Sequence, residues 1–121
     1  MADLNEKLAA YGIDYADALD RLDGNADFYK QLAIKYLDND QYEALVAALE
    51  AGDFDAGYKA SHTLKGVAGN LSFAELYKAA TAVCNAISEG ENDAAEQLLP
   101  DVTKAQNEVI SGLEAWNNGE F

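Results

Sequence analysis

The stretch that decides the fold is residues 52–71, which read GDFDAGYKASHTLKGVAGNL. Its larger apolar side chains, together with Ala60, recur mostly at steps of three and four residues, which is the period of a helix with one buried face. They are Phe54, Ala60, Leu64, Val67 and Leu71. Asp53 is a favourable N-cap residue, and Gly52 can end a preceding helix. The stretch therefore predicts a helix that begins just after Asp53 and packs one side against a core.

The same apolar period continues on both sides of this helix. It predicts three short helices before it and three longer ones around it, near residues 4–11, 15–22, 25–36, 40–52, 72–90 and 92–117. In the third short helix the stripe is Phe28, Leu32 and Tyr36, and Asn25 is the expected N-cap. In the last helix the stripe is Leu99, Val102, Gln106, Val109, Leu113 and Trp116.

Several residues mark helix boundaries in the second half of the chain. Ser72 and Glu75 have the spacing of a capping box, with Leu71 and Leu76 placed as a hydrophobic staple. Asn92 is the expected N-cap of the last helix. Pro100, the only proline, either kinks that helix or marks its restart.

These elements predict an all-α fold. Short connections favour antiparallel neighbours, so the chain is expected to form an up-down four-helix bundle over about residues 40–117. Extra short N-terminal helices, over about residues 3–38, are expected across one end or side of it. The 121 residues suit a single domain spanning 1–121.

Composition excludes several classes of function. The chain has 22 Asp and Glu against 8 Lys and Arg, a formal charge of −14, which argues against nucleic-acid and anionic-membrane partners. One cysteine and one histidine exclude an internal disulfide and a His-rich zinc site. The acidic clusters are interpreted as helix caps and solvated surface, so no metal site is expected. The beginning of the chain lacks signal-peptide features, and a cytoplasmic location is expected. The ends of the chain suggest a free-standing protein, with a domain of a hybrid kinase as the alternative.

The only histidine, His62, lies on the helix of residues 52–71. One face of that helix carries positions 58, 62, 65, 66 and 69. The opposite face carries the apolar side chains of Leu64, Val67 and Leu71. Lys59 and Lys65 flank the histidine by one turn each. Gly66 and Gly69 each cost about 1 kcal/mol relative to alanine in a helix, which requires a packing or a functional reason.

An exposed imidazole is mostly neutral near pH 7 and is a competent nucleophile. A lysine one turn away neutralises part of the charge of a phosphoryl group on it. A bare glycine surface lets a partner's active site close over the ring. The pattern therefore suits a histidine that receives a phosphoryl group from a docked protein. Close helix packing remains an alternative reason for either glycine.

Residues 61–71, SHTLKGVAGNL, resemble the signature of histidine-containing phosphotransfer (HPt) domains, His-x-Leu-Lys-Gly followed by small residues. The resemblance covers about residues 10–117, and residues 52–90 carry most of its specificity. The chain departs from the family pattern at Val67 and Ser72, neither of which falls on the exposed face.

The resemblance implies a phosphorelay carrier. His62 would accept a phosphoryl group from an aspartyl phosphate on a receiver domain, with Lys65 beside the phosphate, and pass it to another receiver. Lys59, Gly66 and Gly69 would form the docking face, together with Ile13.

The partners implied are receiver domains and a hybrid sensor kinase, with Mg²⁺ on the receiver and no cofactor on this chain. Such a protein is a monomeric, stoichiometric carrier and not an enzyme. Cys84 and Asn85 lie where some members place a polar residue against the imidazole, although a buried inert thiol is the simpler interpretation of Cys84. The alternative is a helical interaction module that docks a receiver or another signalling protein without carrying phosphate.

Overall fold

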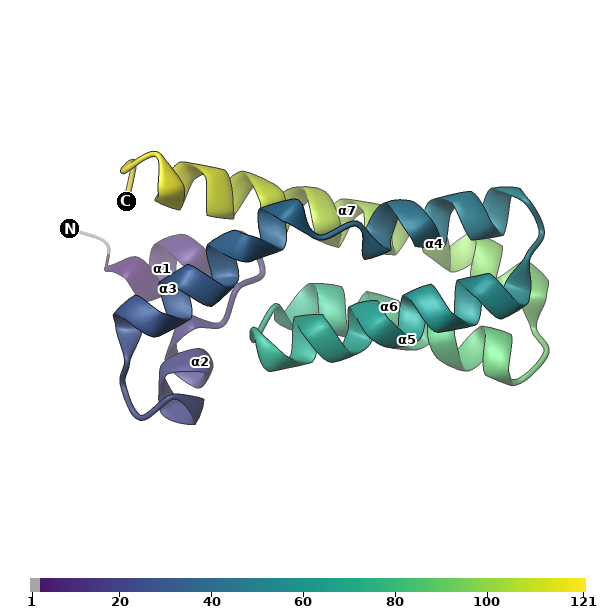
Figure 1. The fold of residues 1–121 in the computed structure, drawn as a ribbon, viewed down its shortest axis with the longest axis horizontal. Helices are drawn as coiled ribbons and strands as arrows, with labels where there is room; N and C mark the ends of the chain where they lie inside the picture. The colour runs from purple at the N-terminus through teal and green to yellow at the C-terminus, as the bar shows by residue number, and fades with distance from the viewer. Residues whose placement is uncertain (1–2) are drawn as a thin grey trace.

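The computed structural model describes residues 3–121, so Met1 and Ala2, where the expected domain begins, lie outside the described residues. All regular elements in the described part are helical (Figure 1). They are α1 (Leu4–Ala9), α2 (Tyr15–Arg21), α3 (Ala26–Lys35), the 3₁₀ helix η1 (Tyr36–Asp38), α4 (Gln41–Glu50), α5 (Phe54–Asn70), α6 (Ala74–Ser88) and α7 (Asn92–Asn117). The predicted all-α fold is confirmed.

Helices α4 to α7 form the predicted antiparallel up-down four-helix bundle. In Figure 1, α4 and α6 run in one direction and α5 and α7 run in the other. The core is made of small and branched apolar side chains from all four helices, with Leu45, Leu64, Leu76, Val83 and Leu113 fully buried. The tight turns between these helices place Gly52 and Gly90 in the left-handed region.

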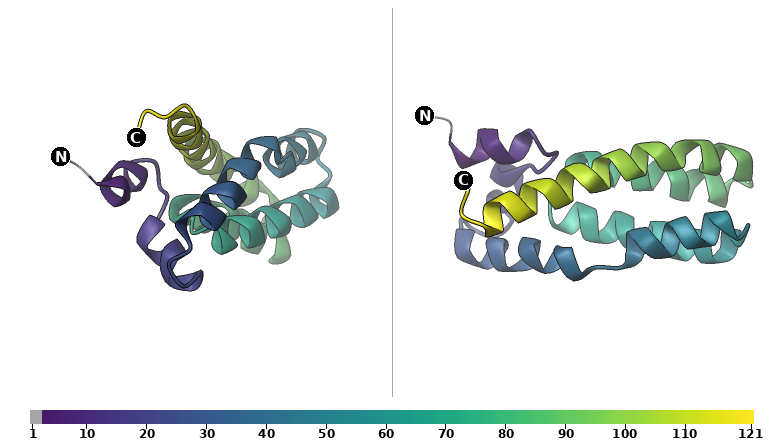
Figure 2. Two further views of the ribbon diagram at one scale, coloured as in Figure 1. Left: turned by 60° about the vertical axis from the view of Figure 1, so that its left-hand side comes forward. Right: turned by 90° about the horizontal axis from the view of Figure 1, so that it is seen from above.

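The N-terminal helices meet one end of this bundle. Helices α1 and α2 lie at that end and α3 lies along one side, which agrees with the placement expected at one end or side. Helices α3, η1 and α4 follow one another along that side of the molecule, and α3 packs against the C-terminal half of α7 (Figure 2). The reason is the length of α7: its 26 residues extend past α4 and give α3 a surface to cover.

The third helix is rotated by about one residue from its predicted orientation. Phe28, expected in the core, is 45% exposed, whereas Tyr29, Ala33 and Tyr36 are buried. The Tyr29 hydroxyl donates a hydrogen bond to the carbonyl oxygen of Leu71 at 2.6 Å. Burial, and then the nearby Tyr15 and Asp14, raise the pKa of Tyr29 far above its ordinary value. Tyr29 therefore remains a hydrogen-bond donor at any physiological pH.

Two helix starts are as predicted, and two are not. Asp53 and Asn25 cap α5 and α3, accepting hydrogen bonds from the third residue after each. The predicted capping box at Ser72 is wrong, because Ser72 takes a left-handed conformation (φ 59°) and α6 begins only after Phe73. The predicted Asn92 cap is also wrong, because Asn92 is already the first residue of α7.

Helix α7 is continuous through Pro100, which lies inside it and is exposed, so the chain does not restart there. The predicted stripe is confirmed for Val102, Gln106, Val109, Leu113 and Trp116, all of which are buried, while Leu99 is half-buried. Within residues 3–121, no helix is both long enough and apolar enough to cross a membrane.

Candidate functional site

Helix α5 presents His62 to solvent and Leu64 to the core. Asp53 Oδ1 accepts a hydrogen bond from the Ala56 amide at 3.1 Å, which fixes where the helix begins. From that start, Ala60, Leu64 and Ala68 point inward and are buried. His62 is therefore held exposed by the packing of the opposite side of its own helix.

Tyr58 lies one turn before His62 and stacks on it. The ring centroids are 5.8 Å apart, and the ring planes differ by 12°. The tyrosine is 39% exposed. Ser61, between them in sequence, is fully buried, and its hydroxyl donates to the Tyr58 carbonyl oxygen at 3.1 Å. The imidazole thus has an aromatic neighbour on the side toward the start of the helix.

The two glycines after His62 have different reasons to be glycine. A Cβ added at Gly69 would lie 3.1 and 3.2 Å from two ring carbons of Tyr77 on α6, so Gly69 permits a close side-chain contact. A Cβ added at Gly66 would meet nothing within 4 Å. The packing alternative therefore accounts for Gly69 and leaves Gly66 without a structural reason.

Lysines stand on both sides of the histidine. Lys59 is exposed and Lys65 is half-buried, and neither forms an ion pair with any described residue. Because these amines have no carboxylate partner, their charge is available to an incoming anion.

A groove of about 530 Å³ begins at Lys65 and Gly66 and runs between α2, α5 and α6. Its walls include Arg21, Asp17 and Lys78. The groove places two further cations beside the glycine face of α5. From the sequence alone Arg21 has no connection with His62, because it lies on a different helix some forty residues earlier.

Arg21 belongs to a clasp that holds α2 against the end of α5. Its guanidinium donates to the Gly69 carbonyl oxygen and to Asp17 Oδ2, each at 3.1 Å. The Ser72 hydroxyl donates to the same Asp17 oxygen at 2.7 Å. Ser72, in its left-handed conformation, donates a hydrogen bond from its hydroxyl to Asp17, and Ser72 lines one side of the groove.

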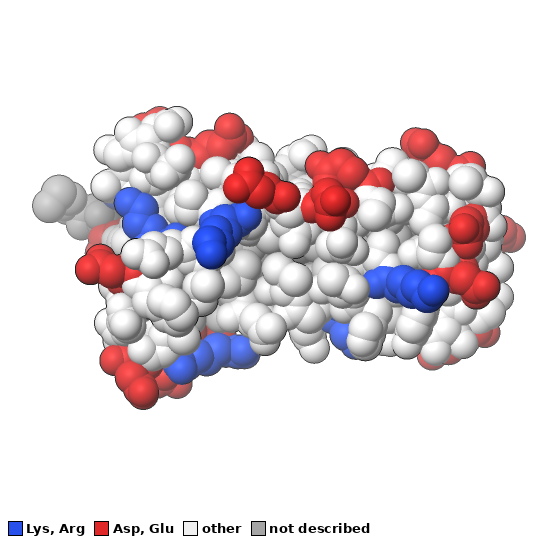
Figure 3. All heavy atoms as spheres, viewed as in Figure 1, with Lys and Arg blue, Asp and Glu red and all other residues white. Residues whose placement is uncertain are grey.

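Charge is distributed very unevenly along this acidic chain. Residues 56–88 contain Lys59, Lys65, Lys78 and only one acid, Glu75, a net charge of +2. The other 88 residues carry a net charge of −16. In Figure 3 the surface over the middle of α5 shows no red side chains, and red gathers around it. The histidine thus lies in the least acidic part of the molecule, which includes all but the first two residues of α5 and all of α6.

Three other residues were considered for a contact with a partner or with the imidazole. Ile13 is fully buried and pairs with Phe73 in an isolated β-bridge, so it does not belong to a docking surface. Cys84 is buried, as the interpretation of an inert thiol requires. Asn85 is exposed, and the structure shows no hydrogen bond from it or from Cys84 to His62 among the described residues.

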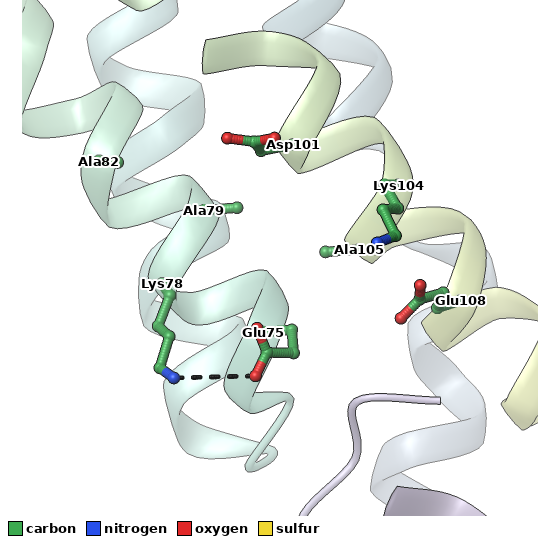
Figure 4. Close-up of a pocket in the computed structure, with 8 residues that line it drawn as sticks. All are labelled: Glu75, Lys78, Ala79, Ala82, Asp101, Lys104, Ala105 and Glu108. Carbon is green, nitrogen blue, oxygen red and sulfur yellow. Dashed lines mark ion pairs between the residues drawn. The ribbon is translucent and has the colours of Figure 1, made fainter. Parts of the chain in front are cut away.

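A second hollow, of about 460 Å³, lies between α6 and α7 (Figure 4). Its floor is made of alanines, and Lys78 and Glu75 form an exposed ion pair of 3.7 Å at its edge. Asp101, Lys104 and Glu108 line the α7 side. The lining of the hollow contains no histidine, cysteine or hydroxyl side chain.

Comparison with known proteins identifies the bundle. A family model described as the Hpt domain matches residues 39–116, well over half of the chain, from just before α4 to the last turn of α7. The chain belongs to the Hpt domain family. The resemblance inferred from residues 61–71 is thereby confirmed. Neither the curated proteins nor the solved structures yield a match to the chain.

Membership of the Hpt domain family indicates a general role for this chain. Hpt domains are phosphocarriers of two-component signalling that interact with receiver domains, so the family supports a phosphotransfer role here. The matched residues include His62 and the whole of α5, whereas α1, α2 and α3 lie outside the match. Arg21 and Asp17 of the clasp therefore lie outside the matched residues, whereas Gly69 and Ser72 lie within them.

Proposed function

We propose that this chain is a phosphorelay carrier that accepts a phosphoryl group on His62 from an aspartyl phosphate of a receiver domain and passes it to another receiver. One observation carries the proposal. The only histidine of the chain is exposed one turn before Gly66, a helical glycine with nothing for a side chain to contact. Gly66 has no packing reason, and access of a partner to His62 supplies a functional one.

The proposed step is a direct displacement at phosphorus. The unprotonated ring nitrogen of neutral His62 forms the N–P bond as the P–O bond of the acyl phosphate breaks. The aspartate carboxylate departs with the bonding electron pair, and the other ring nitrogen keeps its proton. Transfer onward is the same step reversed on another aspartate. The imidazole is the only nucleophile that this chain supplies, and in the onward step the carboxylate of the receiving aspartate is the nucleophile.

The residues around His62 have separate proposed roles. Lys65, one turn away and without a carboxylate partner, neutralises charge on the phosphoryl oxygens. Lys59, Gly66 and Gly69 belong to the docking face. Mg²⁺ is expected on the receiver, and no cofactor is assigned to this chain. The bundle positions the nucleophile, and the chain acts as a stoichiometric, monomeric carrier in the cytoplasm, with receivers and a hybrid sensor kinase as its partners.

The test uses the full chain and a panel of receiver domains preloaded with a labelled small-molecule phosphodonor. The expected result is an acid-labile, base-stable label on this chain, because phosphoramidates are cleaved in acid whereas hydroxyl phosphates are not. A receiver that binds the chain without transferring label, across a panel in which the donors are demonstrably phosphorylated, would favour the interaction module and reject the carrier.

Replacing Lys65 with alanine is expected to slow transfer by about ten-fold. A ten-fold change corresponds to the lower part of the free-energy range of a charge-assisted hydrogen bond, as suits a side chain that is only half-buried. The free energy of unfolding should change by no more than about 0.5 kcal/mol. Rapid-quench measurement of labelled chain gives the rate, and thermal unfolding gives the stability.

The matched control is Lys104→Ala, an exposed lysine on α7 that faces the hollow between α6 and α7. Its transfer rate should equal that of the unmodified chain. Equal rates for all three proteins, at low and at moderate salt, would remove Lys65 from the phosphate site.

A further inference from the structure

Tyr58 is a large aromatic side chain on the exposed side of a helix whose opposite side makes the core. Three large hydrophobic side chains of the described chain are markedly exposed, namely Phe28, Tyr58 and Tyr77. Tyr77 fills the space above Gly69. Tyr58 instead lies parallel to His62, at a centroid distance of 5.8 Å. Tyr77 therefore has a packing role beside Gly69, whereas the aromatic neighbour of Tyr58 is the His62 imidazole.

The two rings are nearly parallel, with centroids 5.8 Å apart and planes that differ by 12°. A neighbour in this position limits how the imidazole can turn, and the opposite side of His62, toward Gly66, is open. An edge-on contact would instead point one aromatic ring at the rim of the other.

Tyr58 and Gly66 lie one turn before and one turn after His62. Side chains on a helix lean toward its N-terminus, so the imidazole leans toward Tyr58 and away from the bare surface at Gly66. The Tyr58 backbone is held in turn by the buried Ser61 hydroxyl, at 3.1 Å from its carbonyl oxygen. The histidine is thus supported on one side and open on the other.

We propose that Tyr58 is a positioning residue for His62, whose stacked ring restricts the rotamers of the imidazole and aims its reactive nitrogen at a phosphoryl group arriving over Gly66. This inference rests on the proposed function of His62. A receiver-bound acyl phosphate approaches along one fixed direction, so the histidine must be oriented before transfer takes place. A small phosphodonor approaches from any direction and does not need that orientation.

The experiment compares Tyr58→Ala and Tyr58→Phe with the unmodified chain, and uses Phe28→Ala as a matched loss of an exposed aromatic ring on another helix. At saturating phosphorylated receiver, Tyr58→Ala should transfer about five- to ten-fold more slowly, with receiver affinity unchanged within about two-fold. Tyr58→Phe should restore the rate, because phenylalanine keeps the stacked ring. Direct phosphorylation by phosphoramidate should be equally fast in all variants.

An independent readout is the proton NMR spectrum of the single histidine. The ring current of Tyr58 should displace the His62 carbon-bound ring protons from random-coil positions, and Tyr58→Ala should return them toward those positions, whereas Phe28→Ala should not.

Three results would overturn the inference while leaving the carrier role in place. They are unchanged transfer in Tyr58→Ala, a defect confined to receiver affinity, and failure of Tyr58→Phe to restore the rate. If the unmodified chain takes no label at all, the carrier role itself fails, and the ring-current comparison still reports whether the stack exists.

Discussion

Replacing His62 with glutamine is expected to abolish phosphoryl uptake from every receiver and to leave the fold unchanged. Glutamine has no nucleophilic nitrogen, because the amide lone pair is delocalised into its carbonyl. His62 is exposed, so its main described contact is the stack with Tyr58. Loss of that contact should reduce the free energy of unfolding by no more than about 1 kcal/mol. Labelled transfer and thermal unfolding of the same samples measure both effects.

Receiver binding separates loss of chemistry from loss of docking. His62→Gln should bind its receiver with an affinity within a few-fold of the unmodified chain, since Lys59, Lys65 and Gly66 are all retained. Label appearing on His62→Gln at the normal rate would move the acceptor to another residue. Loss of binding together with loss of label would instead make His62 chiefly a docking residue.

Replacing Phe73 with alanine is expected to have the largest effect on stability, about 3–5 kcal/mol. Phe73 is fully buried, and its ring meets Tyr36 edge-on at a centroid distance of 5.2 Å. Its backbone pairs with Ile13 in the β-bridge that joins the N-terminal segment to the α5–α6 turn. The substitution therefore leaves a cavity where these two parts of the chain meet. Urea unfolding followed by circular dichroism measures the change.

Phe28→Ala is the matched control, because it removes the same ring from a site that is 45% exposed. Its effect on the free energy of unfolding should be no more than about 1 kcal/mol. Similar losses for the two variants would contradict the description of Phe73 as the link between the N-terminal helices and the bundle.

The bundle was predictable because its signals are local. Asp53 followed by a regular apolar period predicts where α5 begins, and the side of the helix that carries His62 follows from the same period. The turn at Ser72 was not predictable in this way. Its hydroxyl is used by Asp17, 55 residues away, and a capping pattern in the sequence gives no sign of such a competing partner.

The predicted orientation of α3 was wrong for a related reason. Phe28 and Tyr29 are adjacent and equally able to be buried. Tyr29 is the one that is buried, where its hydroxyl donates to the Leu71 carbonyl oxygen and its ring contacts Tyr15 and Trp116. The prediction that Ile13 lies on the docking surface was wrong in the same way. Ile13 is buried, because the exposure of a residue between two short helices depends on what packs over it.

The candidate site was predictable where it depends on one helix and not where it depends on several. Spacing alone places Tyr58, His62, Lys65 and Gly66 on one side of α5. The stack of the two rings was accessible in principle, because aromatic residues four apart on a helix are neighbours. Arg21 carries no such signal, because only the tertiary fold brings α2 to the end of α5.

Gly66 also has a consequence for how this protein responds to selection. Alanine at that position would meet no neighbour and would gain up to about 1 kcal/mol of helix propensity. Laboratory evolution for heat resistance alone should therefore fill this position early. Under selection for signalling, the same position should stay empty. Which residue occupies position 66 would thus record which of the two pressures a lineage of this protein has experienced.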